Sequence, residues 1–389
     1  MKRAYRAGAV ISLDALEYNV KGIRSIIGEK TKLMGVIKTN AYGHGAVSIA
    51  KALDRFGADS FAVATVEEGI ELRRHGITKP VLLLGYVSKE QYPELIINNI
   101  MPAVFTYEMA RDLEAAARKL DAVLDIHLKI DTGMSRIGFK VNLSSVESIV
   151  MINTLCRHLR IQGIFTHMAC ADCEPDEVTE NQVKLFRWML DEIEKRGLQI
   201  PLRHCANSAS IMRYPEMKMN MVRAGIILYG LYPSEEVDKS LLDLKPVMSL
   251  TSHVTFVKTV PSGTGVSYGS TFVCKRPTVI ATVSIGYGDG FPRAASNKGR
   301  VLIRNQSFPI IGRVCMDQLM VDVTDSVEEI KQGDKVVLVG SMGCEEISVE
   351  EASSYGDSFN YEFVCNINRR VPRIYMYDGK LSHIVDYLG

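Results

Sequence analysis

The chain has 389 residues, of which 47% are hydrophobic and 23% charged, a composition typical of a folded globular protein with large cores. Its length indicates two or three domains, since domains average about 150 residues. The 46 basic and 45 acidic residues leave a net charge of +1, which excludes the basic stripe that nucleic-acid binding requires. No run of about 18 apolar residues occurs, so no membrane-spanning helix is expected.

The cysteines and the start of the chain also restrict the class of protein. The basic start, Met1 to Arg6, is not followed by the apolar run of a signal peptide. Only Cys170 and Cys173, among eight scattered cysteines, form a Cys-x-x-Cys pair, and no second pair stands at zinc-ligand spacing. We therefore expect reduced thiols, no metal site and a cytoplasmic location.

The first two thirds of the chain alternate short β-rich runs with amphipathic helical stretches, as βα units around a parallel sheet do. The expected strands are Leu33–Ile37, Phe61–Ala64, Val81–Leu84, Val123–Ile130, Ile161–Thr166, Leu202–Cys205 and Val222–Leu228. Helices are expected between them, with an N-cap at Asp14 and capping boxes at Thr65/Glu68 and Thr179/Gln182.

About eight such units in roughly 240 residues match the usual size of a TIM barrel. A doubly wound open sheet is the competing arrangement, but no Gly-x-Gly-x-x-Gly follows the first strand. We therefore predict an α/β fold that begins with a (β/α)8 TIM barrel over residues 1–240. The first ~10 residues are candidates for pairing with the second domain.

The composition changes after residue 240 and becomes β-like from Val247 onward. The expected strands are Val254–Val260, Thr278–Val283, Arg300–Ile303, Pro309–Gly312, Met320–Val323 and Lys335–Val339. Gly-rich turns separate them, and helical periodicity is nearly absent until about Ser348. This pattern indicates a second, mainly β domain over residues 241–389.

Lys38 stands at the end of the first expected strand, inside the segment Val36–Gly45. A lysine after an apolar run can be desolvated, which lowers the pKa of its amine and suits it to a Schiff base. The structural alternative is a lysine that extends from a strand end into solvent.

Segment Val36–Gly45 resembles the pyridoxal-phosphate lysine motif of alanine racemases. The resemblance extends over the whole chain, and it identifies the chain as a member of that family. The further segments that match in the family's order and spacing are Asp131–Gly138, Asn220–Ile226, Ser267–Gly269, Gly286–Gly290, Gly312–Gln318 and Asn360–Glu362.

The resemblance implies pyridoxal 5′-phosphate as cofactor, with Lys38 as its Schiff-base lysine and as one of two catalytic bases. Tyr268 of a neighbouring subunit would be the second base. A tyrosine is a poor base until its phenolate is stabilised, and His167 with Arg223 would do this through a hydrogen-bonded chain. Arg223 would also face the pyridine nitrogen of the cofactor and disfavour its protonation.

The resemblance further implies a phosphate site made of neutral donors and backbone amides. The residues that match it are Tyr42, Ser208, Gly225, Ile226 and Tyr361. Asn207 and Ser208 also form an N-cap on propensity alone, which is compatible with phosphate binding.

Two further residues match substrate contacts of the family. Arg136 would meet the phenolic oxygen of the cofactor and the substrate carboxylate, and Lys129, which is carbamylated in many relatives, would position it. Met316 would offer its backbone N–H to the same carboxylate from the partner subunit, flanked by Cys315 and Asp317.

Tyr287 and Tyr361 resemble the aromatic pair that narrows the access channel in the family, which would favour a small substrate side chain. The chain departs from the family at Gly288 and Thr39, where alanine is usual or frequent. Neither departure removes a functional group, so they affect the expected range of substrates more than the reaction type.

We therefore expect a cytoplasmic homodimer with shared active sites that racemises alanine and supplies D-alanine for peptidoglycan, without nucleic-acid or membrane partners. The alternatives are a racemase that also accepts serine and a fold-related amino-acid decarboxylase. The decarboxylase would carry a glycine-triplet phosphate loop and a catalytic cysteine, whereas this chain has Arg223–Ile226 and Tyr268. A non-catalytic cofactor carrier would lack the second domain, and a membrane-attached serine racemase would need a spanning segment.

Overall fold

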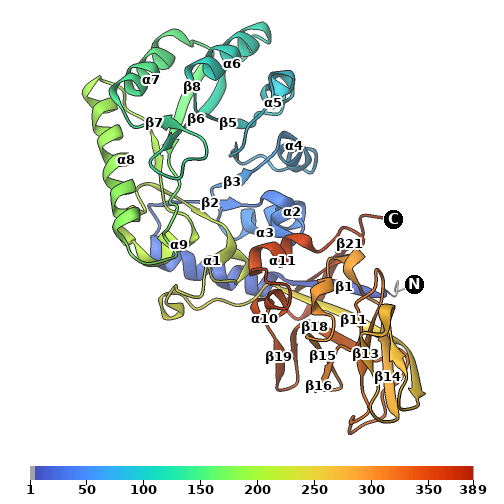
Figure 1. Cartoon of the computed structure of the whole chain (residues 1–389). Helices are drawn as coiled ribbons and strands as arrows, with labels where there is room; N and C mark the ends of the chain where they lie inside the picture. Colours follow the sequence, from blue (N-terminus) through green and yellow to red (C-terminus); the bar gives the residue numbers. More distant parts are fainter. Residues whose placement is uncertain (1–4, 389) are drawn as a thin grey trace. The chain divides into compact units, whose positions relative to one another are not determined.

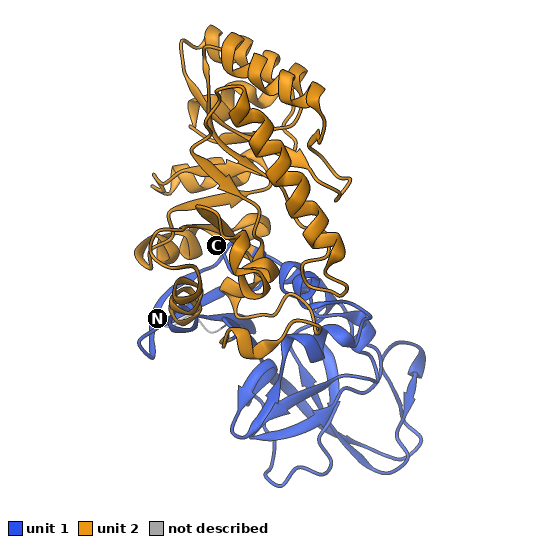
Figure 2. Cartoon of the chain, turned by 90° about the vertical axis from the view of Figure 1, so that its left-hand side faces the viewer, with its two compact units in different colours: residues 1–15, 42–45, 246–389 blue, residues 16–41, 46–245 orange. Residues whose placement is uncertain are grey.

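The structure, a computed structural model, describes residues 5–388 and divides into two compact units (Figure 2). Unit 1 comprises residues 1–15, 42–45 and 246–389, and unit 2 comprises residues 16–41 and 46–245. Two short early stretches thus belong with the last part of the chain rather than with their sequence neighbours. Residues 1–4 of the basic start and residue 389 lie outside the described residues.

Unit 2 is built on eight parallel strands in the order β10-β2-β3-β4-β5-β6-β8-β9 (Figure 1). The first and last strands of this order, β10 and β9, approach each other, since Arg223 N on β10 donates to Ala206 O, just after β9, at 3.0 Å. This near-barrel confirms the expected (β/α)8 arrangement. The strands are β2 Lys32–Val36, β3 Ser60–Val63, β4 Val81–Leu83, β5 Met101–Val104, β6 Leu124–Asp131, β7 Phe139–Lys140 (beside β6), β8 Leu159–Phe165, β9 Leu202–His204 and β10 Met221–Ala224.

Helices follow the strands in sequence and lie around the barrel (Figure 1). Side-chain oxygens of Thr65, Thr106 and Asn142 cap three of them by accepting a backbone N–H three residues on. The α-helices are α1 Leu13–Ile27, α2 Lys38–Tyr42, α3 Ala46–Arg55, α4 Val66–Arg74, α5 Tyr92–Ile97, α6 Tyr107–Lys119, α7 Leu143–Leu155, α8 Glu177–Lys195 and α9 Ser208–Arg213. The short 3₁₀ helices are η1 Lys89–Gln91, η2 Pro215–Met217, η3 Ile226–Tyr229 and η4 Lys239–Leu241.

Two strand predictions for the barrel were incomplete. Strand β5, Met101–Val104, was not predicted, because Pro102 interrupts a short run and argues against a strand. The expected strand Val222–Leu228 ends at Ala224, and its second half is the 3₁₀ helix η3. Both halves are buried and, apart from Arg223, apolar, so periodicity does not separate them.

Two capping predictions were wrong. Helix α1 begins at Leu13, and Ser12 Oγ rather than Asp14 caps it, by accepting from Ala15 N at 3.1 Å. Helix α8 begins at Glu177, so Thr179 and Gln182 lie inside it instead of forming a capping box. At Thr65 the cap is present, as its Oγ1 accepts from Glu68 N at 3.3 Å.

Unit 1 is mainly β, as expected, and its strands run in the order β16-β15-β18-β11-β1-β20-β21. β1 pairs antiparallel with β11 and parallel with β20.

The predicted position of one strand in unit 1 was wrong. A strand was expected at Pro309–Gly312, whereas the observed strand is Gln306–Pro309. The strands are β1 Ala7–Ser12, β11 Met248–Val260, β12 Gly265–Val266, β13 Phe272–Val273, β14 Thr278–Val283, β15 Arg300–Ile303, β16 Gln306–Pro309, β17 Leu319–Asp322, β18 Lys335–Met342, β19 Glu345–Ile347, β20 Arg373–Tyr377 and β21 Lys380–Val385. The helices are η5 Tyr268–Ser270, η6 Tyr287–Asp289, η7 Arg293–Ala295, α10 Val349–Ser354 and α11 Asn360–Asn366.

A fully buried arginine, Arg373 on β20, organises the backbone of unit 1. Its guanidinium donates to the carbonyls of Gly43 at 2.8 Å, Asn368 at 2.7 Å, and Ile367 and Val371 at 2.6 Å. This contact holds residues 42–45 within unit 1. None of the helices in the described part of the chain has the length and apolar character to cross a membrane.

Candidate active site

Lys38 follows β2, where the chain enters a left-handed turn. Thr39, Asn40, Ala41 and Tyr42 all have positive φ, between 51° and 54°, a conformation that costs an L-residue roughly 1–2 kcal/mol. The β-branched side chain of Thr39 makes this a genuine outlier. Strain therefore accumulates directly after the predicted cofactor lysine, as is common in functional sites.

Contacts within unit 2 hold this turn in place. The Glu68 carboxylate, on α4, accepts the backbone N–H groups of Thr39 and Ala64. The Asn40 side chain accepts the N–H of Ala46, at the start of α3, at 2.9 Å. Two polar side chains thus tie the strained turn to neighbouring helices, and Lys38 is fixed at the end of its strand.

Four cationic side chains lie near enough to His167 for their charges to act on its pKa. Burial is the main cause that holds the pKa of His167 well below its usual value, followed by the charges of Arg223, Arg136, Lys129 and Lys38. Unit 2 therefore brings together five of the predicted site residues. Cations gathered around a neutral imidazole form a site for an anionic ligand.

Arg223, on β10, is buried and joins the ends of the neighbouring strands. Its Nη1 donates to Nδ1 and O of His204, at 2.8 and 3.1 Å. Its Nη2 donates to the carbonyls of Thr166 and Cys205, at 2.7 and 3.2 Å. Burial lowers the pKa of Arg223 to about 10, so it stays charged at neutral pH although all these acceptors are neutral.

The protonation of His167 follows from its contact with Arg223. Arg223 Nη2 lies 3.2 Å from His167 Nδ1, and a guanidinium only donates hydrogen bonds. Nδ1 of His167 therefore accepts, and the proton of the neutral ring resides on Nε2. A neutral imidazole in this tautomer can donate to an anionic oxygen in the site.

Lys129 is a buried amine on β6. Its Nζ donates to Ile130 O at 2.6 Å and lies 5.6 Å from the centre of the Phe165 ring. Burial, and then the charge of Arg223, lower the pKa of Lys129 to about 7. A large fraction of this amine is thus neutral and nucleophilic at neutral pH.

The predicted phosphate residues of unit 2 lie around the start of α9 and the end of β10. Asn207 caps α9, since its Oδ1 accepts from Ser210 N at 2.9 Å. Gly225 N donates to Ser208 Oγ at 2.9 Å, so the Ser208 hydroxyl retains its proton for a ligand. Ile226 begins the 3₁₀ helix η3 directly after Gly225.

Gln182 is a positioning residue that the sequence interpretation missed. It is buried on α8, where its Oε1 accepts from Ala169 N at 2.9 Å. Its Nε2 donates to Thr132 Oγ1 and His167 O, both at 3.2 Å. This amide fixes the backbone of His167, and a buried glutamine inside an apolar helical face was the signal for it.

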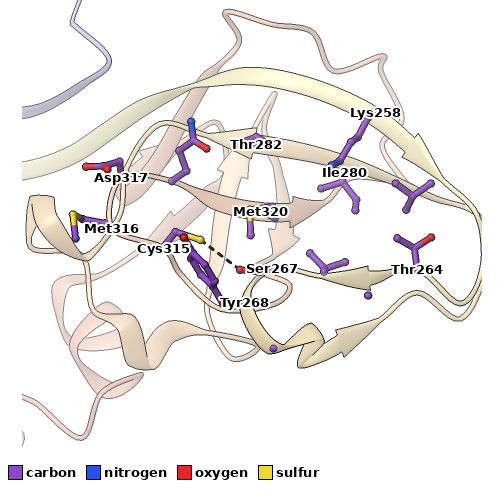
Figure 3. A pocket seen from close by; sticks show the side chains of 15 residues that line it. Lys258, Thr264, Ser267, Tyr268, Ile280, Thr282, Cys315, Met316, Asp317 and Met320 are labelled. Atoms are coloured by element: carbon purple, nitrogen blue, oxygen red, sulfur yellow. Dashed lines mark hydrogen bonds between the residues drawn. The ribbon is translucent and has the colours of Figure 1, made fainter.

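In unit 1, Tyr268 lies on a strained turn beside an open pocket. Ser267 has φ 63° and ψ −173°, a region that is otherwise nearly restricted to glycine. The Tyr268 side chain is 71% exposed, and Ser267 Oγ lies 3.4 Å from Cys315 Sγ (Figure 3). Met316 and Asp317 line the same pocket, which has a volume of about 870 Å³.

The backbone of the segment that carries Met316 is held against the 286–288 turn. Tyr287 N and Gly288 N donate to the carbonyls of Cys315 and Met316, at 3.0 and 2.8 Å. A Cβ at position 288 would lie 2.8 Å from Arg370 Nη1 and 3.0 Å from Met316 O. The departure to Gly288 therefore allows the two segments to approach closely.

Asp317 is also anchored within unit 1. It accepts from Arg370 Nη2 at 2.6 Å, and Arg370 Nε lies 3.1 Å from the buried carboxylate of Asp289. Asp289 in turn accepts from Arg6 and from Gly286 N. The segment that carries Met316 and Asp317 is thus linked through Arg370 to the buried carboxylate of Asp289.

The two aromatic residues predicted to contact phosphate, Tyr42 and Tyr361, lie together in unit 1. Their ring centres are 6.1 Å apart, and Phe359 packs on Tyr361 at 5.3 Å. Burial raises the pKa of Tyr42, so its hydroxyl remains a donor. Tyr287, the other predicted channel residue, is 42% exposed.

Comparison with known proteins assigns both parts of the chain to one family. Residues 11–233 match the family described as "Alanine racemase, N-terminal domain", and residues 247–375 match "Alanine racemase, C-terminal domain". The chain is 46% identical over 369 residues to an alanine racemase of Methanococcus maripaludis, a match that covers 95% of this chain and 98% of the relative.

Solved structures give the same result. An alanine racemase of Clostridium difficile 630 superposes with a TM-score of 0.96 at 42% identity, over 100% of both chains. An alanine racemase of Bartonella henselae, described with covalently bound pyridoxal phosphate, superposes with a TM-score of 0.83 at 27% identity, over 96% of this chain and 100% of that chain.

Because unit 2 contains buried histidines, we expect its free energy of unfolding to depend on pH. Burial lowers the pKa of His127 to about 3, whereas an unfolded histidine titrates near 6.5. Well inside this interval the unfolded state binds nearly one more proton than the folded state, so acidification favours unfolding by about 1.4 kcal/mol per pH unit. We expect urea unfolding between about pH 4 and 5.5 to show a slope that is smaller by nearly one proton in His127→Asn.

The control for this measurement is His75→Asn, because His75 is exposed at the end of α4. That variant should retain the slope of the parent protein. An unchanged slope in His127→Asn would show that His127 is protonated in the folded state.

Proposed function

This chain belongs to the alanine racemase family, and we propose that it interconverts L-alanine and D-alanine with pyridoxal 5′-phosphate bound at Lys38. One observation carries the proposal: the charges of Lys38, Lys129, Arg136 and Arg223 all lower the pKa of His167, and Arg223 Nη2 lies 3.2 Å from its Nδ1. The phosphate and phenolic oxygen of the cofactor and the carboxylate of alanine are the anions that such a site accepts. D-Alanine for peptidoglycan, made in the cytoplasm, is the proposed use of the product.

The residues present fit this cofactor. Within residues 5–388, the side-chain hydrogen bonds of the buried Arg223 all come from Nη1 and Nη2, so its Nε–H is available to a ring nitrogen. The Ser208 hydroxyl, the Ile226 N–H and the hydroxyls of Tyr42 and Tyr361 are the proposed phosphate donors, together with Gly225. When bound, pyridoxal phosphate withdraws electrons from Cα of the amino acid, which makes its proton removable.

Two bases on opposite faces of Cα are required for racemisation. We assign one face to the Lys38 amine and the other to Tyr268 of a second copy of the chain. The Nε2–H of His167, held in that tautomer by Arg223, would stabilise the Tyr268 phenolate. This lowers the free energy required to use tyrosine as a base near neutral pH.

The substrate carboxylate is assigned to Arg136 and to the backbone N–H of Met316 of the second copy. Cys315 and Asp317 would support Met316, because they flank it and Asp317 is anchored by Arg370. Tyr287 and Tyr361 would limit the side chain of the substrate to about the size of a methyl group.

Lys129 is proposed to carry a carbamate. Its neutral amine, favoured by burial, would attack the carbon of carbon dioxide, form the N–C bond and release one proton. The resulting anion would pair with Arg136, whereas an unmodified ammonium group would repel it.

The direct test follows L-alanine with the cofactor-loaded chain in deuterated water. We expect loss of optical rotation together with deuterium at Cα in both enantiomers. Tyr268→Phe should slow proton removal from one enantiomer by about 100-fold or more, the usual contribution of a general base. Exchange without inversion in the parent protein would contradict the two-base assignment, and no exchange would contradict the racemase.

The shared site is tested by complementation between two defective subunits. Lys38→Ala and Tyr268→Phe chains, co-expressed with different tags, should form heterodimers in which one of two sites is intact. With random assembly, activity should recover to about one quarter of the parent value. Lys38→Ala with Arg136→Ala is the control, since both changes lie in unit 2 and should not complement. Equal activity of both mixtures would contradict a site shared between subunits.

The carbamate is tested by ¹³C NMR of protein equilibrated with ¹³C-bicarbonate. One carbamate resonance is expected in the parent chain and in Lys140→Ala, which removes an exposed lysine near the end of β7. The resonance should be absent from Lys129→Ala. A parent spectrum without it, and a native mass without added carbon dioxide, would refute the modification.

A further inference from the structure

Two histidines, His127 on β6 and His204 on β9, face each other inside the barrel of unit 2. Both are fully buried, and His127 Nδ1 lies 2.9 Å from His204 Nε2. His204 Nδ1 in turn lies 2.8 Å from Arg223 Nη1. A chain of hydrogen bonds therefore leads from Arg223 through His204 to His127.

The donor and acceptor roles along this chain are fixed by Arg223. Because a guanidinium only donates, His204 Nδ1 must accept. The proton of the neutral His204 ring is then on Nε2, and it is donated to Nδ1 of His127. His127 must therefore carry its own proton on Nε2, so a single cation determines the tautomers of two histidines in series.

Both rings stay neutral because they are buried. Burial, followed by the charge of Arg223, keeps the pKa of His204 well below its usual value, and burial lowers the pKa of His127 to about 3. Phe165 stacks on His204 with ring centres 4.8 Å apart and planes inclined by 7°. These contacts set the plane of the His204 ring but do not distinguish its two flipped orientations.

The His127 ring is accommodated at a cost to stability. Gly163, on β8, faces it so closely that a Cβ there would lie 2.4 Å from the ring. Within residues 5–388, the Nε2–H of His127 has no acceptor, and a buried donor without a partner costs about 1–3 kcal/mol. Because the His127 side chain is held in place at a cost in stability, we expect it to have a role other than stabilising the fold.

We infer that His127 is a positioning residue for the racemisation reaction: it accepts the Nε2–H of His204, selects one of the two ring orientations together with Arg223, and thereby fixes the guanidinium of Arg223. If the His204 ring flipped, a carbon would replace Nδ1 opposite Arg223, and one of the bonds that orient the guanidinium would be lost. This inference rests on the proposed function, because it assumes that Arg223 faces the cofactor.

The test uses two substitutions whose side chains have the same number of non-hydrogen atoms. His127→Asn places its side-chain oxygen near the position of Nδ1 and can still accept from His204, whereas His127→Leu cannot. In the cofactor-loaded chain, we expect His127→Asn to retain most of the turnover number. His127→Leu should lower the turnover number roughly tenfold in both directions, as expected for a misplaced positioning group.

A second readout does not depend on activity. In ¹⁵N-histidine NMR of the cofactor-loaded chain, we expect His204 to be neutral with its proton on Nε2 in the parent and in His127→Asn. In His127→Leu its ring signals should split or broaden, since two orientations become populated. His127→Leu leaves the Nε2–H of His204 without a partner and His127→Asn leaves the NH₂ group of its amide without one, so we do not expect a higher thermal stability in His127→Asn.

The control is His158→Leu, which removes a histidine bonded to Glu114 at 2.8 Å outside this chain of residues. It should leave turnover and the His204 signals unchanged. Equal turnover in His127→Asn and His127→Leu, or a parent His204 protonated on Nδ1, would overturn the inference. Absence of racemisation in the parent would instead refute the proposed function, and the His204 spectrum would still test the orientation by His127.

Discussion

The arrangement of unit 2 depends on one buried cation that has only neutral partners. Arg223 joins the ends of β8, β9 and β10 at the point where the sheet order is not closed by strand pairing. Its hydrogen bonds offset much of the free-energy cost of removing the guanidinium from water, but they do not neutralise its charge. The barrel therefore closes around a positive charge, and this charge determines the protonation of the groups near it.

The charge of Arg223 affects the protonation of the groups around it in the same direction. His167 and His204 both accept from Arg223, so both are neutral and carry their proton on Nε2. The same cation contributes to the low pKa of Lys129. A site with a carboxylate opposite Arg223 would lose these properties, because an ion pair would cancel the field that produces them.

The sequence predicted the barrel well because buried parallel strands are continuous apolar runs, as in Leu33–Ile37. It failed where a proline or a buried polar residue had a tertiary role. Pro102 concealed β5, and Gln182 was interpreted as a cap although its amide binds the loop of His167. The family motifs located the candidate site residues, but neither the left-handed turn after Lys38 nor the histidine chain behind Arg223 has a local sequence signal.

The left-handed turn at residues 39–42 has a consequence for the order of assembly. Four consecutive non-glycine residues with positive φ are unfavourable in an isolated chain, so they adopt this conformation only when Glu68 and Ala46 are already in place. A nascent chain cannot present the Lys38 amine in its final direction before these parts of the barrel have folded. If Lys38 is the cofactor lysine, as proposed, covalent capture of a reactive aldehyde at this position would be coupled to completion of the surrounding fold.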